Sequence, residues 1–129
     1  MTAAHNAVRA RVSRGQSAPL QTLRWSAALA AIAQRYADEL GARGCPLVPS
    51  GNRYGENLFW SSGFEATPRH IVASWSSEPG GHCRQVVSRA TQRVGCGVAR
   101  CGNEQIWVCN YDPPASFLAR RSSTRPQRR

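Results

Sequence analysis

The sequence predicts an α+β fold, a three-layer αβα sandwich built on a short antiparallel sheet. Apolar residues recur every three or four positions in the first part of the chain, as they do in amphipathic helices. Towards the end the period changes, and two short apolar runs flank Gly102-Asn103, a pair typical of a β-hairpin loop. Helices that cover such a sheet form layers around a shared core.

Two helices are expected in the N-terminal part of the chain. The first follows the spacing of His5, Val8 and Val12. The second spans residues 24–43, where one apolar stripe runs the whole length and glycines follow it. The stripe consists of Trp25, Leu29, Ile32, Tyr36 and Leu40.

A strand and a third helix are expected next. The segment 54–60, "YGENLFW", is rich in aromatic and apolar residues and predicts a strand. Thr67 then suits the N-cap of a helix, with Pro68 at its first position. The buried face of this helix is expected to be Ile71, Val72 and Trp75. Glu78 follows on the same face, and a carboxylate that points at a core needs a partner such as His82.

The hairpin loop fixes the register of the two last strands. With a loop at residues 102–103, paired positions sum to 205, so Cys96 lies opposite Cys109 in a non-hydrogen-bonded pair that is compatible with a disulfide. Cys101 faces the other side of the sheet and needs a distant partner. The four tryptophans are expected in the core and at turns; they are Trp25, Trp60, Trp75 and Trp107.

Composition indicates one domain in an oxidising compartment. A chain of 129 residues with 41% hydrophobic content buries a single core, and it contains no apolar run of about 18 residues that would span a membrane. Five cysteines are many for a small cytosolic protein, and their odd number means that at least one thiol is left over or pairs between molecules.

The positive charge is concentrated at the C-terminus. The formal net charge is +10, all basic residues are arginines, and five of the 17 lie in residues 120–129. We therefore expect a domain over residues 1–118 and a disordered, Arg-rich tail over residues 119–129. That tail is either a solvated terminus or a contact for an anionic surface or polyanion.

Six stretches together resemble a known family. The sequence is similar over residues 3–116 to the CAP superfamily, which groups cysteine-rich secretory proteins, antigen 5 and plant pathogenesis-related proteins. The stretches are "AHNAVRARV", "LRWSAALAAIAQRYADEL", "YGENLFWSSG", "SWSSEPGGHCRQVV", "RVGCGVARC" and "WVCNYDPPA". The resemblance implies an αβα sandwich, the CAP or SCP-like domain, in a secreted or extracellular protein. We expect it to be a monomer.

The resemblance also implies a cleft with two histidines and two glutamates, often a divalent metal site. Glu56, Glu78 and His82 match three of these positions, and Pro49 stands where the family has its first histidine. Proline offers no side-chain ligand, so two interpretations remain. The three residues hold a cation such as zinc together with waters, or Glu78 and His82 form a polar pair that lines the cleft. Glu56 is either a structural anchor or part of that cleft.

The cysteine pairs implied by the resemblance are Cys45–Cys101 and Cys96–Cys109, the second of which agrees with the hairpin register. Cys83 is then the free thiol. His82 is badly placed to activate Cys83, because adjacent side chains diverge in both helices and strands. His5 and His70 are expected to be partly buried and structural.

Three functions follow. The first is a secreted, non-enzymatic binding or defence protein whose cleft takes a small apolar ligand; the resemblance implies a sterol or fatty acid. The second is a hydrolase or metal-dependent enzyme that uses Glu56, Glu78 and His82. The third is a polyanion-binding module that acts through its arginines.

Overall fold

A computed structural model describes residues 1–77 and 80–115. Its sheet has the strand order β1-β3-β4-β2, in which β1 is parallel to β3 and the other neighbours are antiparallel. The elements are α1 (Thr2–Val12), β1 (Arg24–Trp25), α2 (Ala27–Ala42), β2 (Gly55–Ser62), α3 (Pro68–Ser77), α4 (Gly81–Val86), β3 (Arg93–Cys101) and β4 (Glu104–Asp112). The α+β prediction is confirmed, with the difference that the parallel strand β1 makes the sheet mixed.

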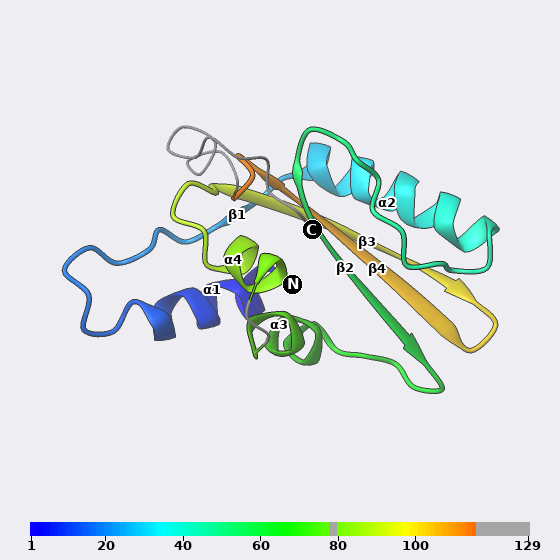
Figure 1. The fold of residues 1–129 in the computed structure, drawn as a ribbon, viewed down its shortest axis with the longest axis horizontal. Helices are drawn as coiled ribbons and strands as arrows, with labels where there is room; N and C mark the ends of the chain where they lie inside the picture. Colours follow the sequence, from blue (N-terminus) through cyan, green and yellow to red (C-terminus); the bar gives the residue numbers. More distant parts are fainter. Residues whose placement is uncertain (78–79, 116–129) are drawn as a thin grey trace.

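Helices cover both faces of the sheet. In Figure 1, α2 lies on one side of the strands, and α1, α3 and α4 gather on the other. Two groups of buried residues correspond to these layers. The α2 side contains Ala33, Ala37, Leu40, Cys45, Leu58, Ile106 and Val108. The other side contains Val8, Leu23, Ala66, Ile71, Val72, Trp75, Val86, Val94, Cys109 and Tyr111.

Helix α2 packs unusually close to β3 because two glycines face it. A Cβ atom on Gly97 would lie 2.4 Å from the Cα atom of Gln34, and one on Gly95 would lie 2.2 Å from the backbone nitrogen of Ala30. Small helix residues suit this approach, and two alanines lie between two leucines on the buried line of α2. This line consists of Leu29, Ala33, Ala37 and Leu40.

The apolar stripe predicted for residues 24–43 is therefore partly wrong. Trp25 precedes the helix, which begins after the N-cap Ser26, whose hydroxyl accepts a hydrogen bond from the Leu29 amide. Trp25 instead pairs with Val94 as the end of β1, and 48% of it is exposed. A two-residue strand has no period of its own, so its pattern merged with that of the helix.

The hairpin has the predicted register, with Cys96 opposite Cys109. These two cysteines form a disulfide on the face covered by α1, α3 and α4, and their Cα atoms are 4.1 Å apart. Cys101 projects from the opposite face and is bonded to Cys45, just after α2. The two disulfides are the pairs that the sequence resemblance implies. Cys96–Cys109 joins β3 to β4 within the hairpin, and Cys45–Cys101 joins the segment after α2 to the end of β3.

At both edges of the sheet, side chains from the helices form hydrogen bonds with backbone groups that have no partner strand. The Gln34 side chain accepts a hydrogen bond from the Val98 amide at 3.1 Å and donates one to its carbonyl at 2.8 Å. At the other edge, the Trp75 indole donates to the Leu58 carbonyl at 2.9 Å. These contacts leave fewer strand groups free for pairing with another chain.

The third predicted helix is confirmed in its cap and its buried face. The Thr67 hydroxyl accepts a hydrogen bond from the His70 amide at 3.1 Å, and the helix begins at Pro68. Ile71, Val72 and Trp75 are its buried residues. The short helix α4 was not predicted, because "GHCRQV" shows no helical apolar period.

Two expectations about aromatic residues are wrong. Trp60 is 45% exposed because it lies on the edge strand β2, where its indole donates to Glu104 at 2.8 Å. Trp107 is partly buried and Trp75 is buried. His70 is exposed and not partly buried, and its ring packs edge-on against Phe59 and Phe64.

No helix in the described ranges is long and apolar enough to cross a membrane. The predicted tail at residues 119–129, and the domain limit at residue 118, lie outside the described residues.

We predict that Gly97→Ala destabilises the fold by about 3 kcal/mol, since the added methyl group meets the backbone of α2 and neither element can yield without losing contacts. Urea denaturation followed by circular dichroism measures the change. The matched control is Gly81→Ala, because a Cβ atom at Gly81 meets nothing within 4 Å. Equal midpoints for Gly97→Ala and the unmodified chain would contradict the close packing.

Candidate functional site

Glu56 stands at the start of β2 and holds the loop that precedes the strand. Its Oε1 atom accepts a hydrogen bond from the Ser50 amide at 2.9 Å, and its Oε2 atom accepts one from the Ser50 hydroxyl at 2.6 Å. Asn110 Nδ2 also approaches Oε2, at 3.5 Å. Both carboxylate oxygens are thus engaged by the protein itself.

The side chain of Glu56 belongs to the α2 face of the sheet. The residue pairs with Asn110 on β4, in the row next to Leu58 and Val108, which pack under α2. Glu56 also lies close enough to Tyr36 of α2 to affect its phenol. Burial raises the pKa of Tyr36, and the negative charge of Glu56 raises it further.

His82 lies in the opposite layer. It is an exposed residue of α4, and its ring stacks on Trp75 with the centroids 6.5 Å apart and the planes inclined by 20°. Its carbonyl accepts a hydrogen bond from the Asn57 side chain at 3.1 Å. Asn57 follows Glu56 and points to the other face, so β2 contacts α4 through the asparagine.

Of the other two cleft positions, Pro49 lies within the described residues and Glu78 does not. Pro49 is exposed in the loop before Ser50. Glu78 lies outside the described residues, so its pairing with His82 stays a prediction.

A buried chain of hydrogen bonds runs beneath His82. The His5 Nδ1 atom is 2.9 Å from the Met1 carbonyl, which can only accept, so this nitrogen carries the proton. The Tyr111 hydroxyl then donates to His5 Nε2 at 2.7 Å, and Asn57 Nδ2 approaches the same hydroxyl at 3.3 Å. His5 is structural and fully buried, and burial lowers its pKa to about 4.

Sequence reasoning missed the contributions of Asn57 and Tyr111. Burial also raises the pKa of the Tyr111 phenol, which therefore stays protonated. One signal was available. Along their strands, both residues alternate with the apolar residues that face α2, so their side chains point to the opposite face of the sheet. A polar side chain that is buried there needs a hydrogen-bond partner.

Position 55 has room only for glycine, because the Gln85 side chain of α4 packs against it. A Cβ atom on Gly55 would lie 2.1 Å from Gln85 Oε1. The same oxygen accepts a hydrogen bond from the Ala115 amide at 2.9 Å, and Gln85 Nε2 donates to the Thr91 hydroxyl at 2.8 Å. Gln85 thus joins α4, the start of β2 and the segment after β4.

Cys83 is the free cysteine of the described residues and is half-buried in α4. It follows His82 directly in a helix, where neighbouring side chains diverge by about 100°. The arrangement does not favour a Cys-His nucleophile pair.

The described residues alone do not fit a metal ion. Residues 1–77 and 80–115 contain no group of three or more His, Cys, Asp or Glu side chains that could hold one. Glu56, which the family resemblance would make a ligand, already accepts two hydrogen bonds from Ser50. The set that includes Glu78 extends beyond the described part of the chain.

The chain resembles known proteins over most of its length. The profile of the CAP family, described as the cysteine-rich secretory protein family, matches residues 2–111. A pathogenesis-related protein of PR-1 type from Sambucus nigra is 40% identical over 92% of this chain and 77% of its own length. Pathogenesis-related protein 1 from Arabidopsis thaliana is 38% identical over 88% and 74% of the respective chains.

Solved structures have the same fold. MpPR-1i is 26% identical, with a TM-score of 0.61, over 88% of this chain and 84% of its own. NaASP2, determined with Zn²⁺, is 23% identical, with a TM-score of 0.68, over 88% of this chain and 77% of its own.

We predict that acid destabilises the protein through His5. Its pKa is about 4 in the folded chain and 6.5 in the unfolded chain. Between these two values the unfolded state binds a proton on this ring and the folded state does not, so a lower pH favours unfolding. Stability from this residue is complete above pH 6.5 and decreases as the pH falls to 4, by about 3 kcal/mol at ~1.4 kcal/mol per pKa unit.

Urea midpoints measured from pH 7 to pH 4 test this expectation. The groups that face His5 are the neutral Tyr111 and two cations, Arg9 and the N-terminal ammonium, which both disfavour its protonation. His5→Gln removes the titrating ring, so its stability should vary less across this window. The same pH slope in both proteins would refute the assignment.

Proposed function

Because the chain belongs to the CAP family, we propose that it is a secreted, non-enzymatic binding protein of the pathogenesis-related, defence type. Its PR-1 relatives from plants support the defence role. Its two disulfides, Cys45–Cys101 and Cys96–Cys109, support secretion, since such bonds persist in oxidising compartments.

The state of Glu56 is the observation that carries the non-enzymatic proposal. A general base or a metal ligand needs a free lone pair directed at a substrate or ion. Here the hydroxyl and amide of Ser50 donate to the two carboxylate oxygens, and Pro49 supplies no ligand beside them. These bonds use one lone pair on each oxygen and fix the carboxylate against residue 50, so in this proposal Glu56 acts as an anchor for the loop.

A small apolar ligand, a sterol or fatty acid, is proposed to bind along the loop that Glu56 anchors. Leu47 and Val48 are 58% and 43% exposed there. Tyr36 holds this lip in place, because its hydroxyl donates to the Val48 carbonyl at 2.5 Å. Covering a leucine side chain with a ligand contributes roughly 1.5–3 kcal/mol.

We predict that Leu47→Ser weakens binding of a fluorescent fatty acid or sterol about tenfold, since it removes most of this apolar contact. Fluorescence titration of the purified chain measures the affinity. Val12→Ser is the matched control, because Val12 is an exposed apolar residue of α1, 38% accessible. The apolar contact is excluded if both variants bind as tightly as the unmodified chain.

The metal-dependent enzyme is the competing function, and zinc separates it from the first. We predict no saturable zinc binding by calorimetry in a Cys83→Ser background, which removes the free thiol as an adventitious ligand. Saturable binding that disappears in both Glu56→Gln and His82→Ala would overturn the non-enzymatic proposal, and peptide and ester substrates would then be the next assay.

A further inference from the structure

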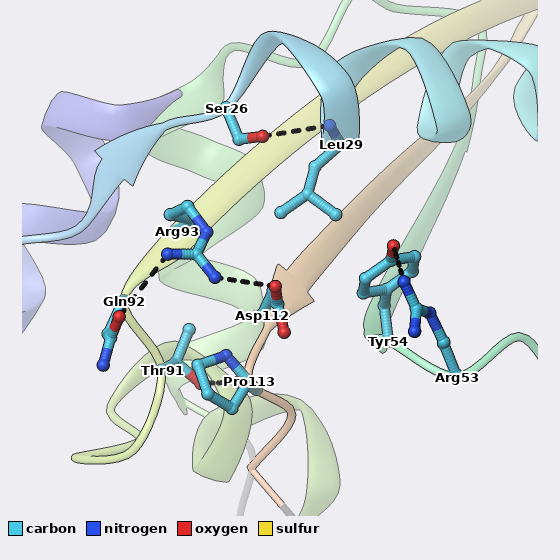
Figure 2. Close-up of polar contacts among 9 residues, drawn as sticks. All are labelled: Ser26, Leu29, Arg53, Tyr54, Thr91, Gln92, Arg93, Asp112 and Pro113. Carbon is cyan, nitrogen blue, oxygen red and sulfur yellow. Dashed lines mark hydrogen bonds and ion pairs between the residues drawn. The ribbon is translucent and has the colours of Figure 1, made fainter.

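A polar hollow lies at the end of the sheet, away from the hairpin loop. It is lined by Arg53, Tyr54 and Asp112. Figure 2 shows Asp112 with Arg93 on one side and the Arg53-Tyr54 pair on the other. The first two lining residues come from the loop before β2, and the third comes from the end of β4.

Counted together with the neighbouring Arg93, the charged groups at the hollow carry one positive charge in excess. Arg93 Nη2 and Asp112 Oδ2 form an ion pair at 2.7 Å between residues that are opposite each other in the sheet. No ion pair to Arg53 is found among residues 1–77 and 80–115. Asp112 influences Arg53 from a distance: the hydrogen bond with Tyr54 raises the pKa of Arg53, and the charge of Asp112 adds to that effect.

Arg53 is held in a defined position although it is exposed. Its Nη2 atom donates to the Tyr54 hydroxyl at 2.9 Å, and its Cζ atom is 4.9 Å from the centre of the Tyr54 ring. In the described part of the chain no hydrogen bond engages its remaining guanidinium N–H groups. These donors match the two oxygens of a carboxylate.

Glu56 builds the loop that presents this pair. Its carboxylate accepts a hydrogen bond from the Ser50 hydroxyl. The same hydroxyl oxygen accepts a hydrogen bond from the Asn52 amide at 3.1 Å, and Asn52 Oδ1 accepts one from the Tyr54 amide at 3.0 Å. The last two of these bonds each close a tight side-chain-to-backbone turn. The hollow is therefore preorganised by the anchor residue of the candidate site.

The chemistry of the lining residues selects a particular kind of ligand. A guanidinium binds a carboxylate, while the carboxylate of Asp112 and the phenol of Tyr54 accept hydrogen bonds from hydroxyl groups. A zwitterion would place its ammonium group near two guanidinium groups. A dianionic phosphate would exceed the single excess charge and would meet the negative charge of Asp112.

We propose that the hollow formed by Arg53, Tyr54 and Asp112 binds an acidic sugar, with the carboxylate of a hexuronic acid on Arg53 and its hydroxyls on Asp112 and Tyr54. This site goes beyond the apolar contact at Leu47 and Val48, and it uses the folded domain in place of the Arg-rich tail.

Calorimetric titration of the full chain with a galacturonic acid trimer tests the proposal, with the neutral galactose trimer as the control ligand. Arg53→Gln should weaken binding of the acidic trimer about tenfold, the effect expected for loss of a charged hydrogen-bond donor. Arg35→Gln removes an equal charge from an exposed position of α2 and should change the affinity less than twofold. Tyr54→Phe should weaken it severalfold.

Four results would overturn the proposal. They are no binding of the acidic trimer, equal binding of the neutral trimer, equal weakening by Arg53→Gln and Arg35→Gln, and no weakening by either. The third would indicate diffuse attraction to positive charge, and the fourth would favour residues 120–129 as the polyanion contact. None depends on the fatty acid or sterol titration, so the two proposals fail separately.

Discussion

The close approach of α2 to β3 is the constraint on which the rest of the fold depends. Because Gly95 and Gly97 carry no side chains, the helix backbone comes near enough for Gln34 to bond both polar groups of Val98. That contact holds α2 along β3. The segment that follows the C-terminal end of α2 leads to Glu56 at the start of β2. The opposite layer packs through large side chains such as Trp75.

Glu56 connects this framework to the surface. Its carboxylate faces the α2 side and orders residues 50–54, whereas its neighbour Asn57 reaches α4 and the buried Tyr111. A residue whose family resemblance suggests metal chemistry is used here to shape a loop. The two proposed contacts, an apolar lip and a polar hollow, lie on either side of that anchored serine in the sequence.

The sequence patterns predicted whatever depends on neighbouring residues. The Thr67 cap, the buried face of α3 and the Cys96–Cys109 register were all readable, because a cap, a helical period and a two-residue loop act locally. The hydrogen bond between His5 and Tyr111 was not, since it joins residues 106 positions apart. Strand β1 and helix α4 were missed because they are too short to show a period. The exposure of Trp60 depends on which strand lies at the sheet edge, which no local pattern encodes.

The Cys45–Cys101 bond has a further consequence for cleavage of the chain by peptidases. It spans 56 residues of sequence, a stretch that includes the exposed positions 47–49 and 62–65. A single backbone cut at either of these exposed positions leaves both fragments covalently joined, one carrying α2 and the other the hairpin. Nicking at these accessible bonds would therefore not by itself release either half, and the sheet would keep its strands within reach of one another.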